Sequence, residues 1–164
     1  TACSSPQESE VETSSEIIPD EISENFHYIA ARLDKKEFEL FAKRIERYQS
    51  LKTVKADSLR VLFFDENGKQ VSTLTADSGE MNEYSEDIEA SGDVRIQTSE
   101  GYILETEKIF WEKSNNSIRA PLHVHVQKGG DHIYGKNLIT NPQLSHIQME
   151  KVYGQGYRKE MPDF

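Results

Sequence analysis

Residues 72–101 have the sequence STLTADSGEMNEYSEDIEASGDVRIQTSEG, and residues 102–131 have the sequence YILETEKIFWEKSNNSIRAPLHVHVQKGGD. Apolar and small residues recur between them at a constant offset of 30 positions, in the pairs Leu74/Leu104, Ala76/Thr106, Ile88/Ile118, Ala90/Ala120, Val94/Val124 and Ile96/Val126. Weaker copies lie on either side, so that four copies are centred at Ala42, Ala76, Thr106 and Gly135. A fixed period of about 20 to 50 residues is typical of stacked units that bury their apolar faces against their neighbours. We therefore expect a stacked architecture of about four weak repeats.

Within each repeat the apolar residues have a period of two. In the clearest segment the inward positions are Ile118, Ala120, Leu122, Val124 and Val126. Successive side chains of a strand point to opposite faces, so the pattern predicts one strand with an apolar face and a polar face. Turn-forming residues at 66–68, 99–101, 115–116 and 129–130 separate such segments. Each repeat is therefore expected to be two strands joined by a turn.

Residues 35–48, KKEFELFAKRIERY, are ambiguous, because their apolar residues also fit the spacing of an amphipathic helix. The repeat favours strands, since Phe38, Leu40 and Ala42 align at period two with the copy at Ala76. We expect strands at 26–32 and 37–44 with a turn at Asp34 and Lys35. The predicted fold class is all-β.

The amino-acid composition excludes some classes of function. Hydrophobic residues make up 35% of the chain, which fits strands with one polar face. Asp and Glu number 29 against 19 Lys and Arg, for a net charge of −10. An acidic chain without a basic run is a poor nucleic-acid binder, because neutralising phosphates supplies most non-specific affinity. No apolar run approaches the roughly 18 to 20 residues that span a bilayer. We expect neither nucleic-acid binding nor a membrane-spanning segment.

Thr1-Ala2-Cys3 resembles the end of a bacterial lipoprotein signal, in which Cys3 would carry the lipid anchor; the alternative is an incidental cysteine. Residues 4–20 are rich in Ser and Glu and have little apolar content to offset the entropy of ordering. We expect a lipoprotein-like N-terminus and flexible acidic tether at 1–21, one β-domain at 22–156 and a tail at 157–164.

Candidate catalytic and metal-binding residues do not form a recognisable motif. His123 and His125 share a predicted strand face, and His132 and His146 follow, but no spacing supplies a third metal ligand. We therefore expect solvent-facing histidines, no metal and no cofactor. The carboxylates Glu83, Glu86, Asp87 and Glu89 cluster in turn-like sequence, as solvated charges do, and not as the defined pair of a glycosidase. No nucleophile or phosphate-loop motif is present, so the sequence predicts no enzyme.

Four aromatic residues, Tyr102, Phe110, Trp111 and Tyr134, allow two interpretations. They would suit a sugar-stacking platform, but aromatic residues on strands more often pack across a sheet. We favour packing.

The order and spacing of several short motifs resemble a known family. These are ASGDVRI at 90–96, EGYILET at 100–106, IFW at 109–111, NSI at 116–118, PLHV at 121–124 and IYG at 133–135. Together they resemble the lipopolysaccharide transport protein C (LptC) family and its OstA/LptA-like relatives over about residues 26–154. The resemblance implies a twisted, open β-jellyroll of two antiparallel sheets that form a trough.

The resemblance also implies a function and partners. The protein would be a non-enzymatic periplasmic component that accepts lipopolysaccharide, or lipooligosaccharide, from an inner-membrane ABC transporter. It would pass the lipid to an LptA-like β-jellyroll by edge-strand pairing, and so along a bridge to the outer membrane. Acyl chains would lie in an apolar groove, since burying each methylene contributes about 0.8 kcal/mol. Alternation assigns the groove lining to Phe38, Leu40, Leu74, Ile88, Val94, Ile96, Leu104, Ile118, Leu122, Val124, Val126 and Ile133.

One departure from the family keeps alternatives open. Its better-known members are held by a transmembrane helix, whereas this chain offers Cys3. A lipid anchor in the inner membrane is favoured, and the outer membrane remains possible. The alternatives are an LptA-like soluble or outer-membrane-tethered bridge protein, and a structural surface lipoprotein with a closed core.

Overall fold

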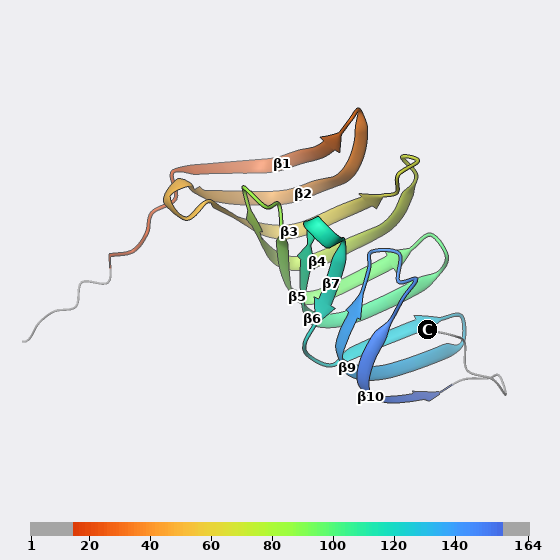
Figure 1. Ribbon diagram of the computed structural model, residues 1–164. Coiled ribbons are helices and arrows are strands. Elements are labelled where there is room, and N and C mark those ends of the chain that lie inside the picture. The colour runs from red at the N-terminus through yellow and green to blue at the C-terminus, as the bar shows by residue number, and fades with distance from the viewer. Residues whose placement is uncertain (1–14, 156–164) are drawn as a thin grey trace, which may run out of the picture.

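The computed structural model describes residues 15–155 and is built almost entirely of antiparallel strands (Figure 1). The strands are β1 (Glu21–Arg32), β2 (Lys35–Tyr48), β3 (Thr53–Phe64), β4 (Gln70–Asn82), β5 (Ile88–Thr98), β6 (Tyr102–Glu112), β7 (Ser117–Ala120), β8 (Val124–Lys128), β9 (Asp131–Thr140) and β10 (Gln148–Gln155). Short 3₁₀ turns follow β2 (η1, Gln49–Leu51) and β6 (η2, Lys113–Asn115). The all-β prediction is confirmed, and the ambiguous segment 35–48 is strand β2. Cys3, most of the predicted tether and the tail at 157–164 lie outside the described residues.

All ten strands belong to one hydrogen-bonded sheet. They follow the order β1-β2-β3-β4-β5-β6-β7-β9-β10, and β8 pairs with β6 and β9. β1 and β10 each have one strand neighbour within residues 15–155, so they form the two edges of the sheet.

The long strands bend near their middles. Pairing slips between Thr75 and Ser78 on β4 and between Ser91 and Val94 on β5. Left-handed backbone occurs in the same zone, at Ser58 (φ 56°) on β3 and Asn137 (φ 50°) on β9. Bulges and left-handed residues bend a strand and increase its twist. We call this line across the sheet the crease.

The crease divides the sheet into two layers that face each other. Layer 1 contains the strand halves that end at the β1–β2, β3–β4, β5–β6 and β8–β9 turns, and layer 2 contains the halves that end at the β2–β3, β4–β5 and β6–β7 turns. Phe38 on β2 contacts Trp111 on β6 with ring centroids 5.1 Å apart. These strands are four positions apart, which would be roughly 19 Å in a flat sheet. The sheet is therefore rolled over its own apolar face, as a jellyroll requires.

The sequence repeat marks the crease. The repeat centres Ala42, Ala76, Thr106 and Gly135 are buried residues that come just before the bend on alternate strands. A Cβ on Gly135 would lie 2.5 Å from Met149 Sδ and 2.9 Å from the Glu150 carbonyl oxygen, so β10 can approach only a glycine here. The predicted turns at 66–68, 99–101, 115–116 and 129–130 are confirmed, because each lies between two strands. One repeat corresponds to one hairpin.

The prediction of a single strand at 118–126 was wrong. The segment forms β7 and β8, which are separated by Pro121, Leu122 and His123 at the crease. Proline has no N–H to donate to a sheet, which favours a break there. The Thr106 hydroxyl donates a 2.8 Å hydrogen bond to the His123 carbonyl and fixes the break. The alternation is interrupted, and Leu122 is 48% exposed instead of facing the interior.

Candidate functional site

The inner face of the jellyroll carries a row of apolar side chains across neighbouring strands of layer 1. By pairing register this inner row consists of Tyr28, Leu40, Val61, Leu74, Ile96, Leu104, Val126 and Ile133. It begins on the edge strand β1, and Ile133 is the register partner of Gly154 on the edge strand β10. The interior is thus apolar from one edge of the sheet to the other.

Eleven of the twelve residues that alternation assigned to the groove lie in this interior. At most 5% of each is exposed: Phe38, Leu40, Leu74, Ile88, Val94, Ile96, Leu104, Ile118, Val124, Val126 and Ile133. Leu122 is the exception. The assignment omitted Val61, Phe63, Ile109, Trp111 and Leu138, which are equally buried. Val61 and Phe63 lie at a period of two in residues 57–64, and that alternation could have predicted that both face the interior.

Four aromatic residues form a cluster where the layers meet. Trp111 of layer 2 lies edge-on to Phe38 and Phe63 of layer 1, with centroid distances of 5.1 and 5.0 Å. Tyr28 on β1 lies 6.0 Å from Phe38. Trp111 Nε1 donates a 3.1 Å hydrogen bond to Asn116 Oδ1, so its polar atom is satisfied. Trp111 therefore packs in the interior, against the opposite layer and not against neighbouring strands of the sheet as predicted.

Polar side chains bridge the two layers beside this cluster. We call Tyr28, Glu37, Glu86 and Lys113 the cross-layer network. The Tyr28 hydroxyl donates to Glu86 Oε2 at 2.6 Å, and Lys113 Nζ lies 2.6 Å from Glu86 Oε1 and 2.9 Å from Glu37 Oε2. Tyr28 and Glu37 come from β1 and β2, whereas Glu86 and Lys113 come from the turns after β4 and β6. The network therefore joins layer 1 to the turns of layer 2.

The pKa shifts in the cross-layer network favour the charged carboxylate and ammonium groups that form its ion pairs. Burial and the hydrogen bond to Glu86 raise the pKa of Tyr28 to about 12. Burial opposes ionisation of Glu86, but the bonds from Lys113 and Tyr28 outweigh it and lower the pKa of that carboxyl. Burial likewise opposes the Lys113 ammonium, but its bonds to Glu86 and Glu37 outweigh it and raise the Lys113 pKa. The carboxylate and the ammonium are both charged at neutral pH.

A hollow of about 460 Å³ opens next to the cross-layer network. The β1–β2 and β3–β4 turns of layer 1 form one side, and Trp111, Lys113 and Asn116 form the other. We call it the mouth hollow. Its residues are Arg32, Leu33, Lys35, Lys36, Glu37, Phe64, Asp65, Glu66, Trp111, Lys113 and Asn116. It lies between the layers, on the side opposite the crease.

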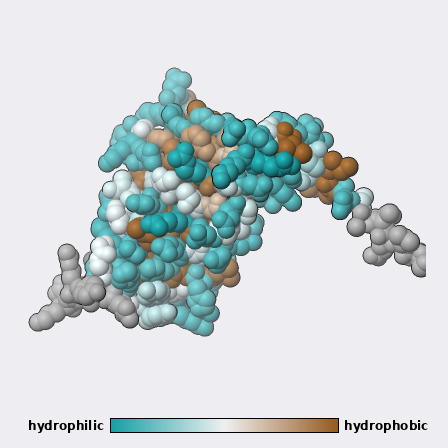
Figure 2. Space-filling model, turned by 180° about the vertical axis from the view of Figure 1, so that it is seen from behind, coloured by the Kyte–Doolittle hydropathy of each residue, from teal (hydrophilic) through white to brown (hydrophobic). Residues whose placement is uncertain are grey.

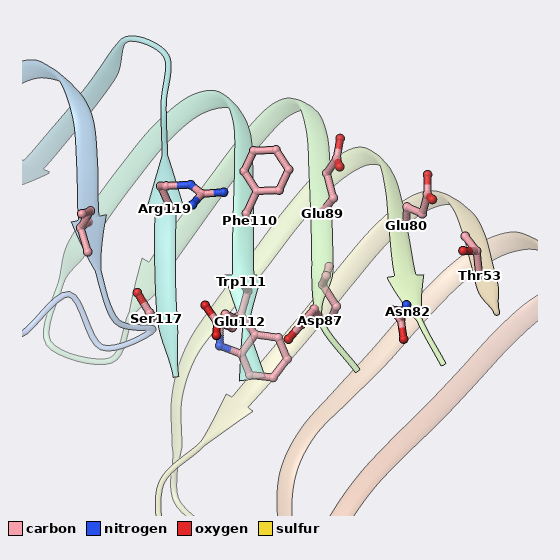
Figure 3. Close-up of a pocket in the computed structure, with 12 residues that line it drawn as sticks. Thr53, Glu80, Asn82, Asp87, Glu89, Phe110, Trp111, Glu112, Ser117 and Arg119 are labelled. Atoms are coloured by element: carbon pink, nitrogen blue, oxygen red, sulfur yellow. The ribbon is translucent and has the colours of Figure 1, made fainter. Parts of the chain in front are cut away.

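A second hollow, of about 430 Å³, lies on the outer face of layer 2 (Figure 3). Glu80, Glu89, Phe110 and Arg119 are register neighbours that project from adjacent strands to the same side of the sheet. Phe110 has the Lys108 ammonium 5.0 Å and the Arg119 guanidinium 5.1 Å from its ring centroid. This hollow has a mixed polar and apolar lining and opens on the outside of the jellyroll.

The acidic residues singled out in the sequence are mostly engaged in specific contacts. Glu83 pairs with Arg47 at 2.6 Å, and Glu89 pairs with Lys108. Asp87 Oδ1 accepts a 2.9 Å hydrogen bond from the Lys113 backbone N–H. They are structural ion pairs and caps and not the simple solvated charges that the sequence suggested.

The histidines lie outside the interior. His123 is exposed, while His125 is half-buried and stacks on Tyr134, which stacks on Tyr153 of β10. His125 Nε2 and His132 Nδ1 are 2.9 Å apart, so one donates a hydrogen bond to the other. Within residues 15–155, no group of three His, Cys, Asp or Glu side chains is placed to hold a metal ion.

We expect His125, with its neighbours His132 and Tyr134, to make the stability of the protein depend on pH. Burial, with a smaller contribution from His132, lowers the pKa of His125, although Glu105 on the paired strand acts in the opposite direction. The neutral form of His125 is therefore favoured in the folded state. Its contribution to the free energy of unfolding is fully present above about pH 6.5 and is lost as the pH falls through the folded-state pKa of His125. The melting temperature should fall between pH 7 and 5 by less in His125→Gln than in the unsubstituted protein. His146→Gln, at an exposed position, is the control and should retain the full dependence.

The outer surface is mainly hydrophilic, with small separate apolar patches on the face seen in Figure 2. Exposed apolar residues on the edge strands include Ile22 and Ile29 of β1 and Val152 and Tyr153 of β10. No helix in the described part of the chain is long and apolar enough to cross a membrane.

Comparison with protein families agrees with this architecture. The model of the lipopolysaccharide-assembly, LptC-related family matches residues 2–155, which is nearly the whole chain. That family is a component of lipopolysaccharide transport in the cell envelope. No curated protein matches the sequence. The chain therefore belongs to the LptC-related family and takes part in lipopolysaccharide transport.

Proposed function

We propose that the protein takes lipopolysaccharide acyl chains into its jellyroll interior, receives the lipid from an inner-membrane ABC transporter and passes it along a bridge of similar jellyrolls to the outer membrane. The exact glycolipid, lipopolysaccharide or lipooligosaccharide, is left open by this proposal. No step requires an enzymatic activity or a cofactor.

The observation that carries the proposal is the inner row. Eight apolar register partners, from Tyr28 to Ile133, run perpendicular to the strands and connect the two edges of the sheet. An acyl chain laid along this direction would contact apolar side chains over its whole length, and each buried methylene would contribute about 0.8 kcal/mol. A row that reaches both edges could continue into a second jellyroll.

The edges supply a means of joining jellyrolls. β1 spans 12 residues and β10 spans 8, and the outward backbone groups of an edge strand can pair with another strand. Addition of an LptA-like strand at one edge, and of a transporter domain at the other, would align the apolar interiors. In this proposal Cys3 carries a lipid anchor that holds the protein at a membrane, with the inner membrane favoured.

A closed-core structural lipoprotein is the second candidate, and burial of the interior favours it. Phe38, Ile96 and Leu104 are fully buried by neighbouring side chains. Lipid capture therefore requires the two layers to separate, whereas a structural protein would keep them closed. An LptA-like bridge protein is the third alternative and would lack direct contact with the transporter.

Site-specific photocrosslinking in cells tests these alternatives. A small diazirine-bearing aliphatic residue at Ile96 should form a lipopolysaccharide adduct that depends on ATP, and the same residue at the adjacent, outward-facing Gln97 should not. Probes at Ile29 on β1 and Tyr153 on β10 should each capture a protein partner. A folded protein without an Ile96 adduct would favour the structural lipoprotein, and capture of jellyrolls without the transporter would favour the bridge protein.

A further inference from the structure

Lipid can reach the interior only if the layers part, because the inner row is already packed. Backbone pairing joins each strand to its sheet neighbours, and the pairing order places no bond between β1 or β2 and the turns after β4 and β6. Across the side opposite the crease, these elements are joined by side chains. The closure of that side therefore depends on contacts that can break without disrupting the sheet.

The cross-layer network supplies polar contacts across that side. Lys113 lies between Glu37 of layer 1 and Glu86 of layer 2, and Tyr28 adds a hydrogen bond to the same Glu86. Charge-assisted hydrogen bonds contribute more than neutral ones, but these groups are partly exposed, so solvent weakens them. Such a closure is strong enough to hold the layers together and weak enough to open.

The surroundings of the network suit an amphiphile with a polar head. The mouth hollow places Trp111 and Phe64 near the interior, and Leu33 is 87% exposed at its outer end. Arg32 and Lys35 also line it, as do Asp65 and Glu66, and in the described part of the chain none of these four side chains forms an ion pair. The hollow therefore combines apolar side chains with unpaired charges of both signs, which suits a lipid that has apolar chains and a polar head.

We infer that the mouth hollow is the entrance for the acyl chains of an amphiphilic lipid, and that Lys113, held by Glu37 and Glu86, keeps this entrance closed. The acyl chains pass Trp111 to reach the inner row when the layers separate, and the polar head stays outside, at the charged rim of the hollow. This inference rests on the proposed function and adds the route of entry and the groups that control it.

A covalent lock across the entrance tests the inference. In the full chain with Cys3→Ser, Glu37→Cys and Lys113→Cys are introduced and joined by a short bis-maleimide. The readout is the rate of adduct formation between purified lipopolysaccharide and a diazirine residue at Ile96. The locked protein should form the adduct at least roughly tenfold more slowly than the same variant before locking, because a covalent tie prevents the open state from forming.

Two further proteins complete the test. Thr73→Cys and Gln97→Cys, which are register partners on neighbouring strands β4 and β5, provide a matched lock within one layer that should leave the rate unchanged. Glu37→Gln weakens the network with one conservative change and should speed adduct formation by about threefold to tenfold. Circular dichroism and melting curves establish that each variant is folded. If the double cysteine variant does not fold, the rate of adduct formation in Glu37→Gln tests the inference instead.

The outcomes separate the inference from the function on which it rests. A locked protein that forms the adduct as fast as the unlocked one overturns the entrance while lipid capture in the interior stands. An unchanged rate in Glu37→Gln overturns the closing role of the network. If the Cys3→Ser parent forms no adduct at all, the proposed function fails and the entrance fails with it.

Discussion

Replacing Trp111 by alanine is expected to lower the free energy of unfolding by about 3–5 kcal/mol. Trp111 is 4% exposed and contacts Phe38 and Phe63 of the opposite layer, so alanine would leave a cavity at the point where the layers meet. Because a domain of this size typically has a total stability of about 5–15 kcal/mol, a loss of this size removes much of it. Urea denaturation followed by circular dichroism measures the change.

Phe110→Ala is the matched control for Trp111→Ala. The two residues are adjacent on β6 but point to opposite faces, and Phe110 is only half-buried on the outer surface. Its loss removes contacts with Lys108 and Arg119 and should cost roughly 1 kcal/mol, the usual value for exposed cation–π pairs and partial burial. Equal destabilisation by both substitutions would contradict the assignment of the inner and outer faces.

Replacing Ile96 by aspartate should destabilise the fold by about 3–5 kcal/mol or more at neutral pH. Ile96 is fully buried between its register partners Leu74 and Leu104, none of which can pair with a charge. Desolvation raises the pKa of a buried carboxyl, so the folded state binds its proton more tightly than the unfolded state does. The variant should therefore lose stability as the pH rises from 5 to 7.

The adjacent outward position gives the comparison. Gln97→Asp, at an exposed site on the same strand, should change stability by no more than about 0.5 kcal/mol. Thermal melts of both variants at pH 5 and pH 7 provide the measurement. A folded Ile96→Asp protein of ordinary stability would mean that the interior admits water, which is a property of an open groove and not of the packed interior described above.

Sequence alone was sufficient for most of the strands, because the information is local. Alternation depends on the two-residue period of a strand, and turns depend on residues such as Gly68 and Asn116 that adopt left-handed backbone. The repeat also predicted similar hairpins, and the structure shows why its centres are small or buried. They lie beside the crease, where the layers come closest. The lipoprotein anchor at Cys3 and the lipid-lining role of the inner residues remain predictions.

The prediction of inward-facing residues from alternation was wrong where a bend interrupts the strand. Leu122 has the spacing of an inward residue, but Pro121 and the crease break the strand and turn it outward. The same limitation applies to the mouth hollow. Glu37 and Glu86 resemble ordinary surface carboxylates in the sequence, and nothing near them predicts that Lys113 would pair with both.

The amino-acid sequence by itself determined most of the strands, most of the hairpin turns and the apolar face of those strands whose alternation is unbroken. Only the tertiary structure decided which strands meet across the interior. Tyr28 and Glu86 are 58 residues apart, and they are within hydrogen-bonding distance because the twist and bend of the whole sheet bring β1 over the turn after β4. Twist accumulates over many strands, so its result cannot be read from any one segment.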